Sequence, residues 1–102
     1  MAEQGESVAP TPATLSEAHS LLAALPSWAA TPDPTIEPSG AIALEWDLGP
    51  NRFLVFAVKG LGFIEHSAIF GLGNERWGTN NFAGTLGKQE LSLLADLMQM
   101  KA

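Results

Sequence analysis

The sequence predicts an α+β protein, in which an antiparallel three-stranded β-meander is flanked by an N-terminal and a C-terminal helix. Two observations carry this prediction. The stretch 41–70 contains three runs of β-branched, aromatic and aliphatic residues separated by two short turns, as in strands joined by hairpins. Leucines with helical spacing lie before it, at 14–25, and after it, at 88–100. With room for a short fourth strand, the expected order is α-β-β-β-(β)-α.

The length and composition indicate one globular domain. The chain has 102 residues, enough for a single core. Residues 1–13 are polar and contain prolines, so a flexible tail is expected there, followed by a single α+β domain at 14–102. The absence of cysteine excludes disulfides and thiolate metal sites. The acidic start and the lack of a long apolar run predict a cytoplasmic protein with no membrane partner.

The charge balance argues against one class of partner. Eleven acidic and five basic residues give a net charge of −6. Direct nucleic-acid binding is not expected, because it depends on clustered Lys and Arg. An acidic surface suits a protein partner with a basic surface, or it serves solubility alone.

The first helix is expected to begin at a T-x-x-E capping box formed by Thr14 and Glu17. Apolar residues recur at helical spacing from Leu15 to Leu25, and Pro26 ends the pattern. Residues 26–40 contain four prolines. They predict an extended connector with neither helix nor regular strand.

The turns of the meander suggest a register. A four-residue loop and a two-residue loop would pair Asp47 with Arg52 and Lys59 with Gly62. This register collects the following residues on the core face: Ile42, Leu44, Trp46, Phe53, Val55, Ala57, Ile64, Ala68 and Phe70, with His66 as the single polar member. We expect His66 to be a hydrogen-bonded core histidine.

The opposite face of the sheet is unusual in this register. Leu54, Phe56 and Val58 form an apolar centre between Glu45 and Glu65. A small sheet with one covered face normally has a more polar back. Either the second helix covers this face, or another chain does. The hypothesis is that the meander serves as both scaffold and docking surface.

Residues 71–87 form a long Gly- and Asn-rich segment, which is typical of a functional loop or of a hidden short element such as an edge strand at 82–86. It carries side chains suited to protein binding, namely Glu75, Arg76, Trp77, Asn80 and Asn81. The alternative is that Trp77 and Phe82 pack under the loop and anchor it. A helix at 88–100 follows, with Gly87 as its cap and Glu90 in its first turn.

The sequence contains no strong catalytic motif, and no cofactor or metal is expected. Gly71-Leu72-Gly73 lacks the third glycine of a dinucleotide fingerprint, and neither histidine has a second ligand at useful spacing. Glu45 and Glu65 share the outer face of the predicted sheet, as paired carboxylates do in inverting hydrolases. A charged rim that keeps the half-exposed sheet soluble is the favoured explanation of these two residues.

The leading functional hypothesis is a small acidic, bacterial-type protein that is not an enzyme and docks on another protein. It would act as an inhibitor, an antitoxin-like neutraliser or an anti-defence factor. One alternative is a self-associating structural module, a homodimer paired through the outer sheet face. Another is a small hydrolase that uses Glu45 and Glu65. The predicted partner-binding residues are Glu45, Leu54, Phe56, Glu65, Glu75, Arg76, Trp77, Asn80 and Asn81.

Overall fold

The computed structural model describes residues 8–99, which form two helices and one five-stranded antiparallel sheet. The elements are α1 (Pro12–Ala24), β1 (Asp33–Ile36), β2 (Ile42–Asp47), β3 (Arg52–Val58), β4 (Phe63–Phe70), β5 (Glu75–Asn81) and α2 (Lys88–Gln99). The α+β class is confirmed. The sheet has five strands rather than three or four, and they lie side by side in chain order.

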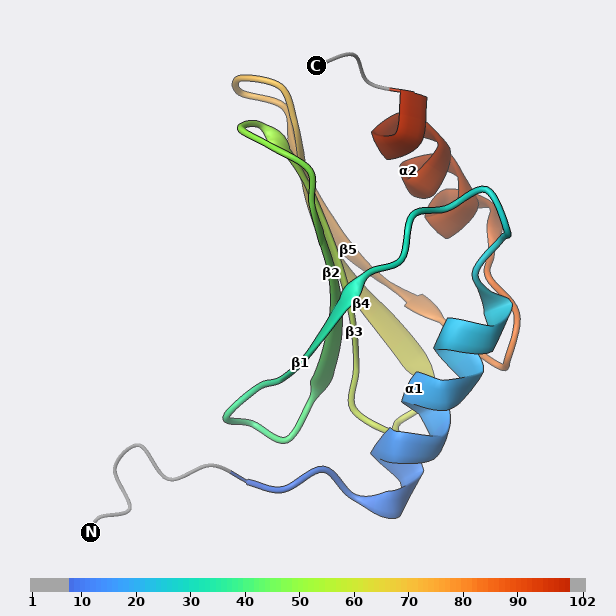
Figure 1. Cartoon of the computed structure of the whole chain (residues 1–102). Helices are drawn as coiled ribbons and strands as arrows, with labels where there is room; N and C mark the ends of the chain where they lie inside the picture. The colour runs from blue at the N-terminus through green and yellow to red at the C-terminus, as the bar shows by residue number, and fades with distance from the viewer. Residues whose placement is uncertain (1–7, 100–102) are drawn as a thin grey trace, which may run out of the picture.

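Both helices lie on the same side of the sheet, and no helix of the described chain lies on the other side (Figure 1). The core lies between the two layers. Its largest fully buried side chains come from both layers: Trp46, Phe56, Leu21, Leu44, Leu54, Ile64, Leu94, Leu97, Glu90 and Val58. We call the side that faces the helices the inner face of the sheet, and the other side the outer face.

The connector prediction is wrong for four residues, because β1 forms within the proline-rich segment. The backbone N–H of Glu37 donates to the carbonyl oxygen of Ala41 over 2.9 Å. Because hydrogen-bonded positions alternate along an antiparallel pair, Thr35 also bonds to β2 and Pro34 does not. Pro34 therefore lacks its N–H at a position that faces away from the sheet, where proline is tolerated.

The sheet also extends further at its other edge. The sequence-based edge strand at 82–86 is wrong, since the strand lies earlier, as β5, within the segment expected to be a loop. Gly and Asn make Glu75–Asn81 a poor strand by propensity, so its pairing with β4 determines its conformation. Residues 71–73 form the hairpin loop between these two strands.

The four hairpins share a three-residue loop and the position of one left-handed residue. In each, the paired residue numbers add to an even number, so each is centred on a single residue: Ser39, Pro50, Leu61 or Leu72. These centres lie eleven residues apart. The residue after each centre has a positive φ: 91° at Gly40, 59° at Asn51, 86° at Gly62 and 73° at Gly73. Three-residue hairpin loops commonly end in such a left-handed residue.

When a hairpin loop has an odd number of residues, the even-numbered residues of the two strands that it joins lie on the same face of the sheet. Even-numbered strand residues point to the inner face in every strand, and odd-numbered ones point to the outer face. The sequence-based register assumed two loops with an even number of residues and is wrong. Trp46 pairs with Leu54, and Val58 pairs with Ile64.

The wrong register exchanges the inner and outer faces of β3 and of no other strand of the predicted meander. Leu54, Phe56 and Val58 are fully buried on the inner face, whereas Phe53 and Val55 lie on the outer face. Both loop lengths were predicted wrongly, and the second error restores the correct faces at β4. The predicted core faces of β2 and β4 are therefore confirmed.

Helix α1 begins three residues earlier than expected, and the predicted capping box is wrong. Thr11 is the N-cap, and its hydroxyl oxygen accepts the backbone N–H of Thr14 over 3.1 Å. Part of the predicted tail thus belongs to the helix, and Val8 donates its N–H to the carbonyl oxygen of Pro38. Residues 1–7 of that tail lie outside the described part of the chain.

The carboxylate of Glu17 joins α1 to the β3–β4 loop instead of capping the helix. One oxygen accepts the backbone N–H of Gly60 over 2.8 Å, and the other accepts that of Gly62 over 2.9 Å. At the other end of the sheet, the Nε–H of Arg52 donates to the carbonyl oxygen of Leu97 over 3.1 Å. This contact places a cation at the C-terminal turn of α2, where it is favourable.

The predicted helix at 88–100 is confirmed as α2 through Gln99, and residue 100 lies outside the described part of the chain. Glu90 reaches back to the N–H of Gly87 over 3.0 Å. The connector between α1 and β1 is held by Trp46, whose indole N–H donates to the carbonyl oxygen of Ala30 over 2.7 Å. Trp28 remains 52% exposed.

Within residues 8–99, neither helix has the length and apolar character needed to cross a bilayer.

Candidate functional site

The outer face combines apolar side chains with carboxylates. Its larger apolar members include Phe53, Val55 and Ile69, which are half-buried, and Trp77, which is 74% exposed. Five carboxylates surround them: Asp33, Glu45, Asp47, Glu65 and Glu75. We call these nine residues the acid-rimmed patch. Lys59 contacts this patch, with its Nζ 3.7 Å from a carboxylate oxygen of Glu65.

The register orders the patch into rows across the strands. One row runs Asp47, Phe53, Ile69 and Glu75, so an aromatic and an aliphatic side chain lie between two carboxylates. The next row runs Asp33, Glu45, Val55, Ser67 and Trp77. Side chains that are neighbours in a row are about 5 Å apart at Cβ. Each row can therefore contact a partner as a continuous strip.

Trp77 stands between two shallow hollows. A hollow of about 180 Å³ includes Phe53, Ile69 and Glu75 in its lining, and one of about 250 Å³ includes Glu65 and Thr79. Ser67 lines both hollows. An exposed indole between two depressions can insert between side chains of a partner, as interface hot spots do.

Two predicted partner-binding residues are not on this face. Leu54 and Phe56 have no exposed surface, because β3 has the opposite orientation to the one expected. Their predicted place in a docking surface is wrong. The predicted character of the face survives, since Phe53 and Val55 take their positions between carboxylates. This outcome is possible because β3 is apolar on both sides.

Two further predicted residues, Arg76 and Asn80, point to the inner side of β5. The guanidinium of Arg76 lies 3.3 Å from a carboxylate oxygen of Asp96 and 5.1 Å from the ring centre of Phe70. The amide N–H groups of Asn80 donate to Glu90 and to Gln89. These contacts attach β5 to α2.

The remaining predicted residues lie on the outer face. Glu45, Glu65, Glu75, Trp77 and Asn81 all occupy odd-numbered strand positions. The alternative in which Trp77 packs under a loop is wrong, since its side chain projects into solvent. Phe82 is 5% exposed and belongs to the core.

His66 lies on the inner face, as expected, but the expected hydrogen bond is not formed. Neither ring nitrogen has a partner among the described residues. Burial lowers the pKa of His66, and the nearby carboxylate of Glu90 opposes that effect. The opposite strand leaves room for the ring at Gly78, where a Cβ atom would lie 2.9 Å from Cε1 of His66.

The pair Glu45 and Glu65 does not share a hollow. The register offsets them by two strands and two residues, which corresponds to about 12 Å by strand spacing. The hollow that includes Glu65 does not include Glu45. No group of three or more potential metal ligands lies together within residues 8–99.

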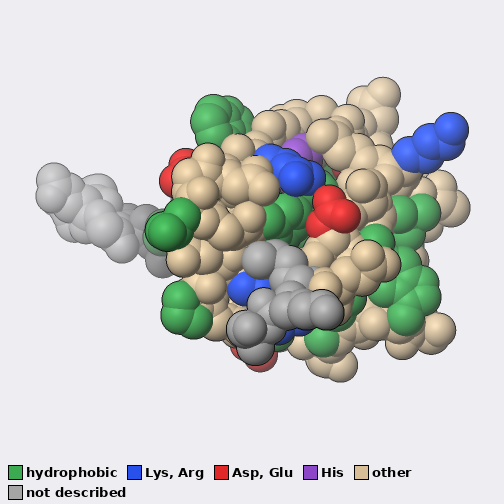
Figure 2. All heavy atoms as spheres, turned by 90° about the horizontal axis from the view of Figure 1, so that it is seen from above, with side chains coloured by type: hydrophobic (Ala, Val, Ile, Leu, Met, Phe, Trp, Pro, Cys, Tyr) green, Lys and Arg blue, Asp and Glu red, His purple; other side chains and the backbone are tan. Residues whose placement is uncertain are grey.

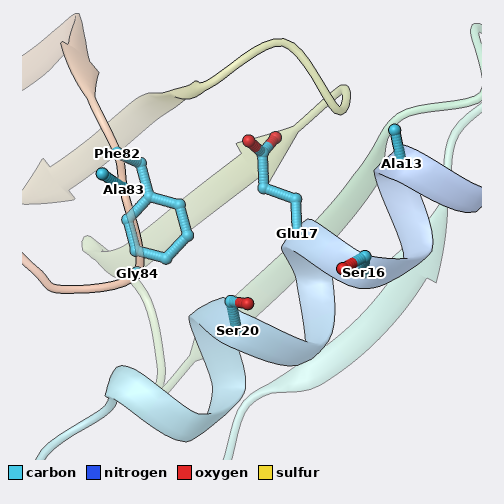
Figure 3. Close-up of a pocket in the computed structure, with 7 residues that line it drawn as sticks. All are labelled: Ala13, Ser16, Glu17, Ser20, Phe82, Ala83 and Gly84. Atoms are coloured by element: carbon cyan, nitrogen blue, oxygen red, sulfur yellow. The ribbon is translucent and has the colours of Figure 1, made fainter.

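A cavity of about 350 Å³ lies between α1 and the segment that follows β5. Figure 3 shows Ser16, Glu17 and Ser20 on one side of it and Phe82 on the other. The Glu17 carboxylate extends toward the β3–β4 loop, where both of its oxygens accept backbone N–H groups (Figure 3). The charged group of this cavity is therefore engaged in holding the fold together.

The end of the molecule that carries the β2–β3 and β4–β5 loops shows no extended single-sign patch. Acidic and basic side chains lie next to one another near its middle, and hydrophobic side chains project at its rim (Figure 2). Comparison with protein-family models, with curated proteins and with solved structures finds no match for this chain.

Proposed function

We propose that this protein is a small acidic binding module that docks on another protein through the acid-rimmed patch. It would act by covering a surface of its partner, as an inhibitor, an antitoxin-like neutraliser or an anti-defence factor does. The proposal rests on one observation: within residues 8–99, no helix or second sheet covers the outer face of the sheet, although the centre of that face is apolar.

The chemistry of the patch indicates the kind of partner. Trp77 and Phe53 supply exposed and half-exposed aromatic area, the usual source of binding energy at protein interfaces. Five carboxylates around them favour Lys or Arg on the opposing surface and repel acidic partners. Nucleic acid does not fit this surface, since phosphate would meet carboxylates rather than Lys and Arg.

The test is site-specific photo-crosslinking in the source cell. A benzophenone amino acid replaces Trp77 on the outer face, and a matched variant carries it at Trp28, the exposed tryptophan outside the sheet. We expect a specific adduct with one other protein from position 77 and none from position 28. Identification of the adduct by mass spectrometry, followed by Trp77→Ala, gives the affinity loss. We expect about 2 kcal/mol, the cost of removing a hot-spot residue.

Equal adducts from both positions, or a partner captured from Trp28 alone, would contradict the proposal. An adduct with a second copy of this chain would instead favour the self-associating module. In that case Phe53→Glu should abolish the dimer, because it places a carboxylate within the apolar centre of both faces. The net charge of −6 on each copy opposes such pairing.

A further inference from the structure

The hydrogen-bond alternation of β5 defines which of its backbone groups are free. The N–H of Phe70 donates to the carbonyl oxygen of Asn74, and the N–H of Phe82 donates to that of Gly62. Both contacts pair even-numbered residues, so Arg76, Gly78 and Asn80 bond to β4. The N–H and C=O groups of the odd-numbered residues therefore face the open edge. These residues are Glu75, Trp77, Thr79 and Asn81.

The two edges of the sheet differ in their protection. On β1 the positions that face outward are even-numbered, and Pro34 among them has no N–H to offer, nor has Pro32 just before the strand. Proline on a short edge strand is a common protection against unwanted strand pairing. Strand β5 is seven residues long and contains neither proline nor lysine. In the described chain its backbone contacts no element other than β4.

Arg76 does not prevent a further strand from pairing with β5. An inward-pointing charge on an edge strand usually blocks pairing, because a new neighbour would bury it. Here the guanidinium already has Asp96 as its ion partner and the ring of Phe70 beneath it. A strand added beside β5 would meet a neutralised side chain.

The side chains along the edge select the chemistry of an added strand. Glu75 lies on β5 itself and Glu65 lies on β4 opposite Thr79, and the exposed indole of Trp77 lies between the two carboxylates on the outer face. Arg or Lys at alternate positions of a neighbouring strand would reach both kinds of group, through ion pairs and through cation–π contacts.

We propose that the open edge of β5 accepts an extended, basic segment of the partner protein as a sixth strand. This inference rests on the proposed function and specifies the way in which the partner binds. Main-chain bonds to the odd-numbered residues of β5 provide affinity, and alternate basic side chains on the acid-rimmed patch provide specificity.

The experiment measures amide hydrogen exchange by NMR, with an end-capped peptide of about eight residues that alternates Arg and Thr as the probe. In the free protein, the amides of Gly78 and Asn80 should be protected and those of Trp77 and Thr79 should exchange quickly. Addition of the peptide should slow exchange at Trp77, Thr79 and Asn81 by roughly tenfold or more.

Two controls separate strand addition from charge attraction. The same peptide with N-methyl groups on alternate residues keeps its charge but cannot form the ladder, and it should leave the exchange rates unchanged. Thr79→Pro removes one edge N–H that faces away from β4, so we expect the sheet to persist and peptide affinity to fall roughly three- to tenfold. Thr79→Val keeps the N–H and should bind as the wild type does.

Three results would overturn the inference. Peptide binding that shifts Phe53 and Ile69 resonances while the Trp77 and Thr79 amides still exchange quickly would mean docking by side chains alone. The proposed function would then stand. Protection of these amides that rises with protein concentration, without peptide, would assign the edge to a second copy. Failure to bind the peptide at all would exclude a basic strand as the occupant.

Discussion

At the scale of single residues, Glu17 has the most concentrated structural role. Its two oxygens accept the N–H groups of Gly60 and Gly62, so one side chain connects α1 to the far end of β3. We predict that Glu17→Gln lowers the free energy of unfolding by about 1–3 kcal/mol, because an amide nitrogen cannot accept the second N–H. Urea denaturation measures this loss. Ser16→Ala, one residue away on the exposed side of α1, should change stability by less than about 0.5 kcal/mol.

His66 should make stability depend on pH. Burial lowers its pKa in the folded state, so the unfolded chain binds more protons once the pH falls below about 6.5. The histidine therefore costs no stability above that pH, and stability falls as the pH decreases toward the folded-state pKa. We predict that His66→Leu loses less stability between pH 7.5 and pH 5.5 than the wild type. Equal losses in urea titrations at the two pH values would contradict this explanation.

At the scale of elements, the hairpin loops determine which residues face the core. Gly73 has a φ of 73°, and beyond the adjoining residues no atom lies within 4 Å of the place that a Cβ would occupy. The cost of a side chain there is therefore backbone strain alone. We predict that Gly73→Ala destabilises the fold by about 1 kcal/mol. Asn51→Gly at the corresponding position of the β2–β3 loop should be neutral or slightly stabilising. Thermal unfolding of the pair makes the comparison.

The same loops explain what the sequence could and could not predict. The helices and β2 to β4 follow from leucine spacing and from turn residues, because those signals are local. The register of β3 does not follow, since that strand is apolar on both faces and gives no signal when it is inverted. The signal that could have corrected it lies in Asn51 and Gly62, which suit the left-handed last position of a three-residue loop.

The two edge strands escape prediction for different reasons. Proline in β1 and glycine with asparagine in β5 are unfavourable in strands, and both strands form because a neighbour pairs with them. The candidate surface is therefore only partly predictable. Glu45 and Glu65 are placed correctly, because β2 and β4 alternate clearly between apolar and polar residues. Leu54 and Phe56 are not.

At the scale of the whole molecule, docking on the outer face requires that the sheet be covered on one side only. Two neighbouring phenylalanines of β3 test this orientation with the same substitution. Phe56→Lys places an unpaired charge in the core and should cost more than about 3 kcal/mol or prevent folding. Phe53→Lys lies on the outer face and should cost no more than about 1 kcal/mol. Circular dichroism with urea denaturation distinguishes the two. Similar losses would mean that both faces are covered.

Docking of a partner protein on the outer face can be probed directly, because the three tryptophans of the chain lie in three different environments. Trp46 lies in the core, Trp28 in the connector and Trp77 on the outer face. The decisive measurement is the ¹⁹F NMR spectrum of the fluorotryptophan-labelled protein before and after addition of the partner protein that photo-crosslinking identifies. The Trp77 signal is assigned from its loss in Trp77→Phe. We predict that the Trp77 signal shifts while those of Trp28 and Trp46 stay in place. A shift at Trp28 with none at Trp77 would contradict docking on this face.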